Sequence, residues 1–383
     1  MKPDANGAPR LLDGGAAVEV ELKGVPRRFH AVWLRDNARD PATRSPGNGQ
    51  RLINLLDIPR DTTIAHADWT DGGLSLTFAP EDKSVTFDPD WLLDHAYDRP
   101  AVTGLGWTGD HVTLWDAGLD ADALVEDHAV VVGDVDARRR WLSAVRRYGF
   151  ARLTGAPTAS GLVCDVAELF GFVRETNYGR WFDVRAEVDP SNLAYTNLGL
   201  QAHTDNPYCD PVPTLQLLAC LENTVDGGES VVVDGFAAAE RLRREWSRGF
   251  DLLAGHCARF EYAGSPGVRL RSKRPILELG PDGELIAVRF NNRSAAAFTD
   301  IPYDHMADYY RAYRHLADLI EDAALTVRFR LAPGDLFIVD NLRVLHGRTA
   351  ITSGGKRWLQ GCYVDRDGLL STLAALEEDA IDG

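Results

Sequence analysis

Hydrophobic and polar positions alternate along three short segments in the first hundred residues. The alternation has a period of two over residues 17–22, 74–78 and 84–87. This period is typical of β-strands that bury one face. A polar loop rich in Pro, Gly, Asn and Arg covers residues 39–50, between the first strand and the other two. The pattern predicts a small β-rich amino-terminal domain over residues 1–110.

Further along the chain, short apolar runs bounded by Gly, Pro and Asp predict a second set of strands. These strands are expected at residues 150–153, 214–219, 229–233, 285–290, 327–331 and 336–339. Helical spacing of apolar positions predicts helices at residues 139–148, 237–253 and 303–323. The regular alternation of strand and helix that a parallel sheet needs is missing from this pattern. We therefore expect a β-barrel or jelly-roll core with helical insertions over residues 111–383, connected to the first domain by the Gly- and Asp-rich residues 103–121.

Composition narrows the class of protein. The 383 residues are 45% hydrophobic and 26% charged, which is the balance of a folded globular protein. A formal net charge of −16 disfavours nucleic acid as a partner, because phosphate backbones repel acidic proteins. The sequence contains neither a signal-peptide pattern nor an apolar stretch of about 18 residues, so we expect no membrane span. Five cysteines without a C-x-x-C pair favour free thiols in a reducing compartment, and we expect a cytoplasmic protein.

A glycine motif at residues 104–109 matches the pattern G-x-G-x-x-G. A dinucleotide-binding loop has a strand before this motif and a helix after it, so that the pyrophosphate meets the helix amino terminus. The residues that follow here, 110–114, predict a strand instead. We therefore do not expect this motif to bind a nucleotide.

Two residues of metal-binding type lie two positions apart, at His203 and Asp205. On a strand their side chains share one face, which is how a 2-His-1-carboxylate triad presents two of its ligands to Fe(II). The pair is weak evidence by itself, because 57 of the 383 residues are acidic and a second such pair occurs at His66 and Asp68.

A distant histidine and a following arginine make this pattern more specific. His346 follows an apolar strand and a turn, and Arg357 lies eleven residues further on. A metal-bound 2-oxo acid has a distal carboxylate, which the planar guanidinium of an arginine can hold through two parallel hydrogen bonds. The alternative for His346 is a polar residue that merely ends a strand.

Further motifs in the same order make the chain resemble the γ-butyrobetaine hydroxylase and trimethyllysine hydroxylase family of Fe(II)/2-oxoglutarate-dependent dioxygenases. The matching segments cover nearly the whole chain and are residues 31–37, 90–92, 174–180, 192–196, 203–208, 226–230, 290–292 and 340–348. The resemblance implies a double-stranded β-helix (jelly-roll) catalytic domain behind a small amino-terminal domain, and it suggests a homodimer.

The resemblance also implies roles for individual residues. His203, Asp205 and His346 would bind the iron, and Arg357 would bind 2-oxoglutarate. An aromatic cage would hold a trimethylammonium group by cation–π attraction, because a quaternary ammonium cannot donate hydrogen bonds. The residues at the cage positions are Tyr178, Tyr195, Tyr363 and either Trp181 or Phe182, of which the alignment favours Phe182. The residues at positions expected to hold the substrate carboxylate are Asn192 and Asn292. For any single one of these aromatic residues, the alternative to a role in the cage is packing in the hydrophobic core.

One departure from the family concerns a structural zinc. Family members often bind zinc in the small domain through three cysteines and a histidine, but no cysteine precedes Cys164 here. Zinc needs thiolate or imidazole ligands at close spacing. We therefore predict that this protein lacks the structural zinc and that Asp40, Arg39 or Arg44 holds the loop by hydrogen bonds.

Together these features predict hydroxylation of a small trimethylammonium compound that depends on Fe(II), 2-oxoglutarate and O2, with ascorbate as the reductant. γ-Butyrobetaine, converted to L-carnitine, is the leading substrate. The alternatives within the class are trimethyllysine and a trimethylammonium alkylphosphonate, for which Arg289 and Arg293 are candidate anion contacts. Outside the enzyme class, the alternative is a catalytically silent protein that binds a quaternary ammonium compound. The complete set of expected iron ligands argues against this alternative.

Overall fold

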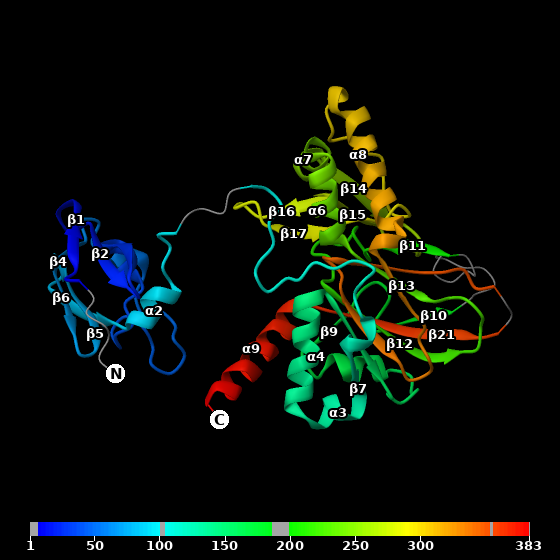
Figure 1. The fold of residues 1–383 in the computed structure, drawn as a ribbon, viewed down its shortest axis with the longest axis horizontal. Coiled ribbons are helices and arrows are strands. Elements are labelled where there is room, and N and C mark those ends of the chain that lie inside the picture. Colours follow the sequence, from blue (N-terminus) through cyan, green and yellow to red (C-terminus); the bar gives the residue numbers. More distant parts are fainter. Residues whose placement is uncertain (1–6, 100–103, 186–198, 353–354, 383) are drawn as a thin grey trace. The chain divides into compact units, whose positions relative to one another are not determined.

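The computed structural model divides the chain into two compact units, residues 1–103 and 104–383 (Figure 1). The structure describes residues 7–99, 104–185, 199–352 and 355–382. The sequence pattern predicts a boundary at residue 110 and a connecting segment from residue 103 to 121. Residues 104–121 instead belong to the second unit, where Trp115 is buried among apolar side chains and its indole N–H donates to the Tyr148 carbonyl at 2.7 Å.

The first unit consists of two antiparallel three-stranded sheets and two short helices. The strands of the first sheet are β1 (Arg10–Leu12), β2 (Ala17–Leu22) and β3 (Val25–His30), and those of the second are β4 (Thr63–Thr70), β5 (Gly73–Ala79) and β6 (Lys83–Phe87). The helices are α1 (Ala31–Asp36) and α2 (Pro89–Asp94). Alternate residues of β2 and β5 are buried, which confirms the strands predicted from the period of two. Phe29, Phe78 and Phe87 fill the core of this unit.

The polar loop after α1 is held by hydrogen bonds of the kind the sequence predicts. The Asp40 carboxylate accepts bonds from Lys83 and Thr43, each at 2.7 Å. The Arg44 guanidinium donates to the Asn37 side chain at 3.2 Å and to a backbone carbonyl in the loop. Arg39 lies over the Trp91 ring instead. Asp40 and Arg44 thus make the expected contacts, and the absence of a structural zinc stays a prediction.

The second unit contains two larger sheets. The seven-stranded sheet has the order β10-β21-β12-β19-β8-β7 with β9 beside β21, and the four-stranded sheet has the order β11-β20-β13-β18. From β10 to β13 and again from β18 to β21, successive strands alternate between the two sheets. The bounds of these strands are β7 (Val125–Asp127), β8 (Phe150–Thr154), β9 (Val173–Arg174), β10 (Phe182–Arg185), β11 (Leu200–His203), β12 (Leu215–Asn223), β13 (Ser230–Asp234), β18 (Thr326–Phe329), β19 (Leu336–Asp340), β20 (Val344–Arg348) and β21 (Arg357–Val364).

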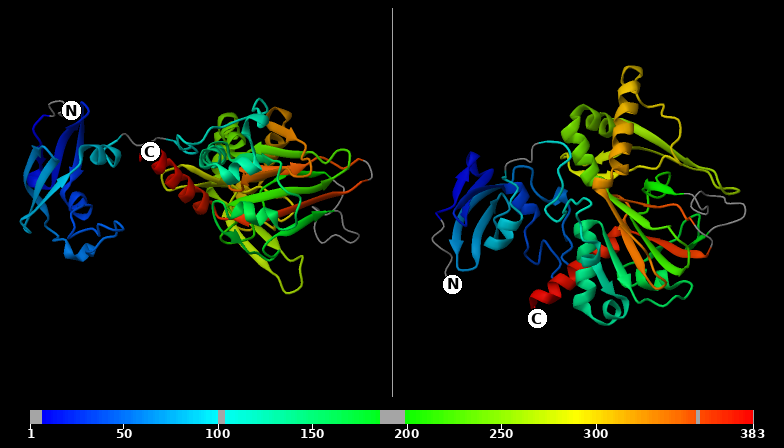
Figure 2. Two further views of the ribbon diagram at one scale, coloured as in Figure 1. Left: turned by 90° about the horizontal axis from the view of Figure 1, so that it is seen from below. Right: turned by 45° about the vertical axis from the view of Figure 1, so that its right-hand side comes forward.

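Helices pack around these sheets in two groups. The first group is α3 (His128–Gly133), α4 (Val135–Tyr148), α5 (Leu162–Ala167) and α9 (Arg366–Asp382), of which α4 and α9 lie side by side (Figures 1 and 2). Helix α4 begins where the Asp134 carboxylate accepts hydrogen bonds from two backbone N–H groups, and it ends at Gly149, whose φ of 77° suits glycine.

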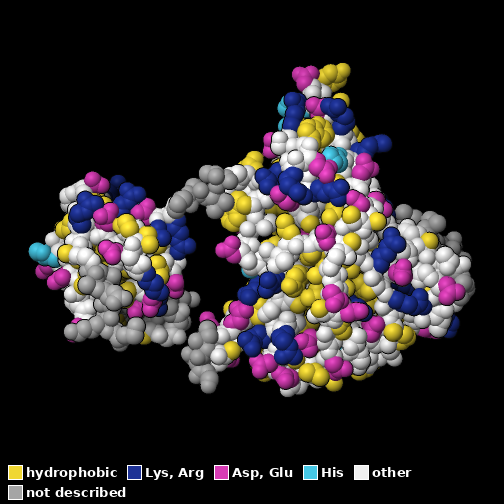
Figure 3. All heavy atoms as spheres, in the orientation of Figure 1, with side chains coloured by type: hydrophobic (Ala, Val, Ile, Leu, Met, Phe, Trp, Pro, Cys, Tyr) yellow, Lys and Arg dark blue, Asp and Glu magenta, His cyan; other side chains and the backbone are white. Residues whose placement is uncertain are grey.

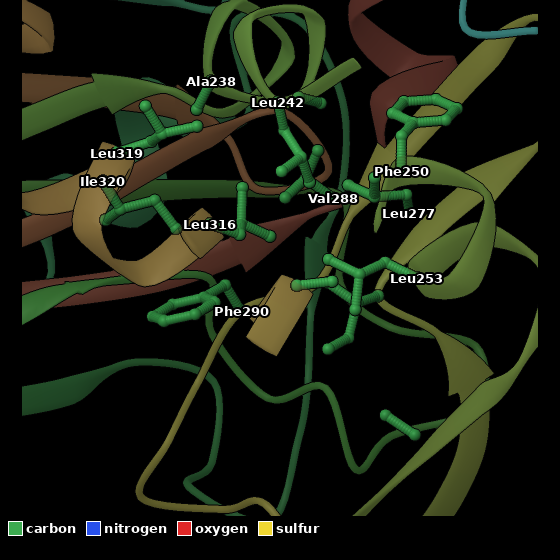
Figure 4. Packing of buried hydrophobic residues seen from close by; sticks show 14 of the residues in the cluster. Ala238, Leu242, Phe250, Leu253, Leu277, Val288, Phe290, Leu316, Leu319 and Ile320 are labelled. Carbon is green, nitrogen blue, oxygen red and sulfur yellow. The ribbon is translucent and has the colours of Figure 1, made fainter. Parts of the chain in front are cut away.

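The second group surrounds another apolar core, shown in Figure 4. Its helices are α6 (Gly235–Glu245), α7 (Ser247–Gly255) and α8 (Tyr303–Glu321), and two hairpins accompany them, β14 (Cys257–Tyr262) with β15 (Leu270–Pro275) and β16 (Leu277–Leu279) with β17 (Leu285–Val288). Leu242, Leu253 and Leu316 meet in this core. The single helix predicted at residues 237–253 is wrong, because the non-helical backbone of Trp246 (φ −156°, ψ 84°) separates α6 from α7. Its apolar period continued across the break because both helices face the same core.

The strand predicted at residues 110–114 is also wrong. These residues run along the second unit as an irregular segment, in which the Arg343 guanidinium donates to the Thr113 carbonyl at 2.6 Å. Side-chain hydrogen bonds thus satisfy backbone groups that a strand would pair within a sheet. The glycine motif at residues 104–109 still lacks the following helix that a nucleotide site requires.

The surface of the second unit mixes charges of both signs. Lys and Arg side chains lie interspersed with Asp and Glu side chains over the face seen in Figure 3. None of the helices in the described ranges is long and apolar enough to cross a membrane.

Candidate active site

Two paired strands bring the candidate metal ligands together. His203 ends β11 and is the direct cross-strand partner of His346 on β20, and their rings are 4.7 Å apart. Asp205 follows β11 by two residues, and its carboxylate lies 3.2 Å from Nε2 of His203 and 3.8 Å from Nε2 of His346. One ligand atom from each of the three residues lies within 4.8 Å of the other two. Two imidazoles and one carboxylate in this arrangement can form the facial triad that binds Fe(II).

Neighbouring groups orient both His203 and Asp205. Nδ1 of His203 lies 2.8 Å from the Gln201 carbonyl, so this nitrogen carries the proton and Nε2 is left to bind a metal. The Gln216 amide and the Tyr363 hydroxyl both donate to Oδ2 of Asp205, at 2.6 and 2.8 Å. These contacts leave Oδ1 of Asp205 facing His203.

The turn that carries Asp205 is fixed by Asn341. Its side chain accepts a hydrogen bond from the Asp205 backbone N–H at 2.6 Å and donates to the Asp205 carbonyl at 2.9 Å. Gln216 and Asn341 are not predicted as site residues by the sequence. Asn341 lies within the 340–348 motif, which was the one signal that could have indicated it.

Burial and neighbouring charges set the protonation states that a metal requires. Burial alone would raise the pKa of Asp205, but hydrogen bonding to His203 and the proximity of His346 outweigh it and hold the pKa well below its usual value. Burial lowers the pKa of His346 to about 3. At neutral pH the cluster therefore offers a carboxylate and a neutral imidazole. Nδ1 of His346 is buried and makes no hydrogen bond within the described part of the chain.

A cavity opens on this cluster and extends to Arg357 at the start of β21. Ser230 and Arg348, which are opposed across β13 and β20, line the same cavity. Burial and the neighbouring Arg348 lower the pKa of Arg357 to about 10, so both guanidiniums stay charged at neutral pH. Nε of Arg357 is buried without a hydrogen-bond partner among the described residues. The cavity thus joins a metal-binding cluster to a cationic end that suits a carboxylate.

Three of the predicted cage aromatics line this cavity. The ring of Phe182 stacks on that of Tyr363 at 5.2 Å, and the ring of Tyr178 lies 6.0 Å from Phe182. Trp181 is 41% exposed and does not contribute to the cavity. Phe182 is opposed to Gly361 in the sheet, and successive residues near a strand project to opposite sides. The structure therefore brings Phe182 into the aromatic group and leaves Trp181 outside it.

Two further tyrosines, which sequence analysis did not predict, extend this aromatic group. The hydroxyls of Tyr178 and Tyr208 are 2.9 Å apart. The ring of Tyr262 lies 5.1 Å from that of Tyr208 and 5.8 Å from that of Tyr178. Tyr262 comes from the β14–β15 hairpin, whose sequence offered no signal of a role in the site.

The residues predicted to bind the substrate carboxylate are placed differently. The Asn292 side chain is exposed, donates to Gln201 at 2.9 Å, accepts from Tyr313 and does not line the cavity. Asn192 and Tyr195 lie outside the described residues. Of the two arginines considered beside Asn292, Arg289 is buried against Glu278, whereas Arg293 lines the cavity.

Comparison with known proteins defines the class of this one. Residues 126–363 match the taurine catabolism dioxygenase TauD, TfdA family. The chain belongs to this family of dioxygenases.

Individual relatives confirm the resemblance seen in the sequence motifs. The chain is 35% identical to the γ-butyrobetaine dioxygenase of Pseudomonas sp. (strain AK-1), over 91% of this chain and 90% of that protein. It is 30% identical to human γ-butyrobetaine dioxygenase over 93% and 92% of the two chains. It is also 30% identical to mouse mitochondrial trimethyllysine dioxygenase, over 94% of this chain and 85% of that protein.

Proposed function

We propose that this protein is an Fe(II)- and 2-oxoglutarate-dependent hydroxylase of a small trimethylammonium acid, with γ-butyrobetaine, converted to L-carnitine, as its substrate. The observation that carries the proposal is the cavity in which His203, Asp205 and His346 lie beside both Arg357 and an aromatic group. The alternation of successive strands between the two sheets supports a jelly-roll as the framework of this cavity.

The residues fit a ferrous ion. Two imidazole nitrogens and a carboxylate are the donor set of non-haem Fe(II) oxygenases, and one such atom from each of His203, Asp205 and His346 lies within 4.8 Å of the other two. Ferrous iron with 2-oxoglutarate and O2 supplies oxidative hydroxylation of an unactivated C–H bond, with succinate and CO2 as coproducts.

The chain's own residues would bind and orient the reactants. Arg357 would hold the distal carboxylate of 2-oxoglutarate, with its neighbour Arg348 adding positive charge at that end of the cavity. Gln216 and Tyr363 would keep Asp205 in its ligating orientation. The apolar walls would exclude water from the reacting centre, and a displacement of about 1 Å could cost on the order of 100-fold in rate.

The aromatic group supports a quaternary ammonium substrate. Tyr178, Phe182 and Tyr363 line one cavity, and an aromatic ring whose face meets a cation can contribute about 0.5–2 kcal/mol to binding it. Relatives named for γ-butyrobetaine and for trimethyllysine support the same chemistry. Trimethyllysine is the second candidate substrate, and a silent quaternary-ammonium binder is the alternative without turnover.

Succinate formation tests the proposal. The enzyme with Fe(II), 2-oxoglutarate, O2 and ascorbate should form one succinate per hydroxylated product with γ-butyrobetaine. Trimethyllysine and 2-trimethylaminoethylphosphonate serve as competing substrates. Coupled turnover with either one alone would replace γ-butyrobetaine in the proposal, and iron binding without any turnover would favour the silent binder.

The homodimer and the cytoplasmic location expected from the sequence stay part of the proposal. The mass of the protein in solution, measured by light scattering after size-exclusion chromatography, tests the dimer. Zinc analysis of the purified protein tests the predicted absence of the structural zinc, which one tightly bound zinc per chain would refute.

A further inference from the structure

Two pairs of histidine rings are in contact in the described part of the chain. One pair is His203 with His346 in the candidate active site, and the other is His256 with His305. His256 directly follows α7, and His305 lies in the first turn of α8. These two helices pack against each other (Figure 1), so the second pair connects the end of α7 to the beginning of α8.

The geometry of the second pair suits a shared metal ion. Nε2 of His256 lies 3.0 Å from Nδ1 of His305. Zinc binds imidazole nitrogens at about 2.0–2.1 Å, so two nitrogens on one ion are about 2.9–3.3 Å apart for bond angles between a right angle and a tetrahedral one. The observed separation lies in this range. Small rotations of the two rings would therefore direct both nitrogens at one ion.

Backbone contacts fix the positions of both histidines. The His256 N–H donates to the Leu252 carbonyl at 3.2 Å, and the His305 N–H donates to the Pro302 carbonyl at 2.9 Å. The outer ring nitrogens, Nδ1 of His256 and Nε2 of His305, reach solvent. Each of them can therefore keep its proton while the inner nitrogen binds a metal.

A carboxylate without a partner lies in the same place. Arg248, Asp251 and Leu252 of α7 line one cavity together with the two histidines. Asp251 is exposed and makes no hydrogen bond or ion pair with another described residue, so its side chain is free to turn. It has to turn toward the histidines to become a third ligand, because the described residues hold three ligand atoms close together only in the active-site cluster.

The positive charge of Arg248 does not exclude a cation from this cavity. Its guanidinium lies 3.2 Å from the Asp308 carboxylate, which compensates the charge. The formal net charge of the chain, −16, also favours the approach of cations.

We propose that His256, His305 and Asp251 form a second metal site, which binds Zn²⁺ with a water molecule as the fourth ligand. Imidazole and carboxylate are ligands that zinc accepts in tetrahedral geometry. The ion would tie α7 to α8, and α8 in turn contacts β11, the strand that carries His203. The inference goes beyond the proposed function and does not depend on it. The alternative is a histidine pair joined only by a hydrogen bond from one ring to the other.

Equilibrium dialysis of the intact protein against Zn²⁺ tests the site. Metal analysis gives the zinc and iron per chain at free zinc concentrations set by a chelating buffer. His256→Gln and His305→Gln should each bind one zinc per chain fewer than wild type, because glutamine lacks the imidazole ligand. The difference holds even if zinc also enters the active-site cluster, because neither variant changes that cluster.

Melting temperatures give a second measurement on the same variants. Saturating zinc should raise the melting temperature of wild type by about 2–5 °C more than that of His305→Gln, because only wild type gains the ion between the two helices. Without zinc, the melting temperatures of the variants show that each one folds.

Two further variants sharpen the test. Asp251→Asn should weaken zinc binding at this site about 10-fold, because the amide is a poorer zinc ligand than the carboxylate. His315→Gln is the matched control, since His315 also lies on α8 but pairs with Glu245 and does not line the cavity. It should bind as much zinc as wild type.

The possible outcomes decide between the metal site and the hydrogen-bonded pair. Equal zinc content in wild type and in both His256→Gln and His305→Gln would overturn the site, as would a wild-type protein that binds no zinc. Unchanged zinc affinity in Asp251→Asn would overturn the role of Asp251. Zinc that remains after both histidine substitutions would lie elsewhere, so the test also separates this site from a structural zinc in the first unit.

Discussion

The two units each contain a cluster of charged and polar residues, and the two clusters differ in how their hydrogen bonds are satisfied. In the first unit Arg35, Asp40, Thr43, Glu81 and Lys83 form what we call the loop cluster. The guanidinium of Arg35, which is only 4% exposed, donates to both oxygens of Glu81 at 2.7 and 2.8 Å. In the second unit, buried nitrogens of His346, Asn206 and Arg357 have no partner within the described ranges.

This difference separates a structural cluster from a functional one. The loop cluster satisfies its own donors and acceptors, so its value lies in the stability of the loop. The active-site cluster keeps buried nitrogens of Asn206 and Arg357 unsatisfied, which costs stability and is explained when a co-substrate or a substrate supplies the missing partner. Substitution of a residue in the loop cluster should therefore reduce the stability of the protein, whereas substitution of a residue in the active-site cluster should reduce its activity.

The largest effect is expected for His346→Ala. This change removes one of the three proposed iron ligands, so hydroxylation should fall to background and the iron content should drop well below one per chain. The melting temperature of the metal-free protein should stay the same or rise, since a buried unsatisfied nitrogen is also removed. Metal analysis and calorimetry measure both quantities. If the variant kept its iron and turned over normally, the assignment of His346 as an iron ligand would be wrong.

Arg35→Met should give the largest loss of stability. It leaves the Glu81 carboxylate without its partner, and we expect the free energy of unfolding to fall by about 2–3 kcal/mol, less than for a fully buried pair because Glu81 is partly exposed. Denaturant unfolding measures this value, and kcat should be unchanged. Arg51→Met is the matched control, because it breaks the more exposed pair with Asp36 and should cost less than about 1 kcal/mol. Equal losses in the two variants would contradict the contrast.

Adjacent aromatic residues provide a smaller and more specific test. Phe182→Ala should raise the KM for γ-butyrobetaine about 3- to 30-fold, because one ring is lost from the aromatic group proposed to bind the cation. Trp181→Ala should leave KM within about twofold, since Trp181 does not line the cavity. The KM for 2-oxoglutarate is the internal control and should change little in either variant. If Trp181→Ala raised the KM for γ-butyrobetaine more than Phe182→Ala, Trp181 and not Phe182 would belong to the aromatic group.

The smallest effect concerns the pH dependence of the loop cluster. Burial alone would raise the pKa of Asp40, but hydrogen bonds from Lys83 and Thr43 outweigh it and lower the pKa. A carboxyl whose pKa is lowered on folding stabilises the protein above its unfolded pKa of about 3.9 and loses that contribution as the pH falls through the folded value. Asp40→Asn should therefore cost up to about 1 kcal/mol at pH 7 and less near pH 3. An equal cost at both pH values would contradict this explanation.

Much of the fold could be predicted from local sequence patterns. The strands with a period of two in the first unit and most apolar runs of the second unit lie where they were expected, because alternation and run length depend only on neighbouring residues. The helix break at Trp246 and the irregular segment at residues 110–114 could not be predicted in this way. Both depend on contacts with distant parts of the chain, such as the one from Arg343 to Thr113.

The sequence by itself determined the chemistry that this protein can carry: two histidines, a carboxylate and a following arginine in an order that indicates a 2-oxoglutarate-dependent oxygenase. Only the tertiary structure decided how these groups are held and what surrounds them. The pairing of β11 with β20 brings His203 beside His346, which is 143 positions later in the chain, and Asn341 fixes the turn of Asp205. Strand register likewise turns Phe182 into the cavity and Trp181 away from it. These choices depend on pairing between distant segments, because the direction of a side chain on a strand is set by the partner strand and not by its neighbours in sequence.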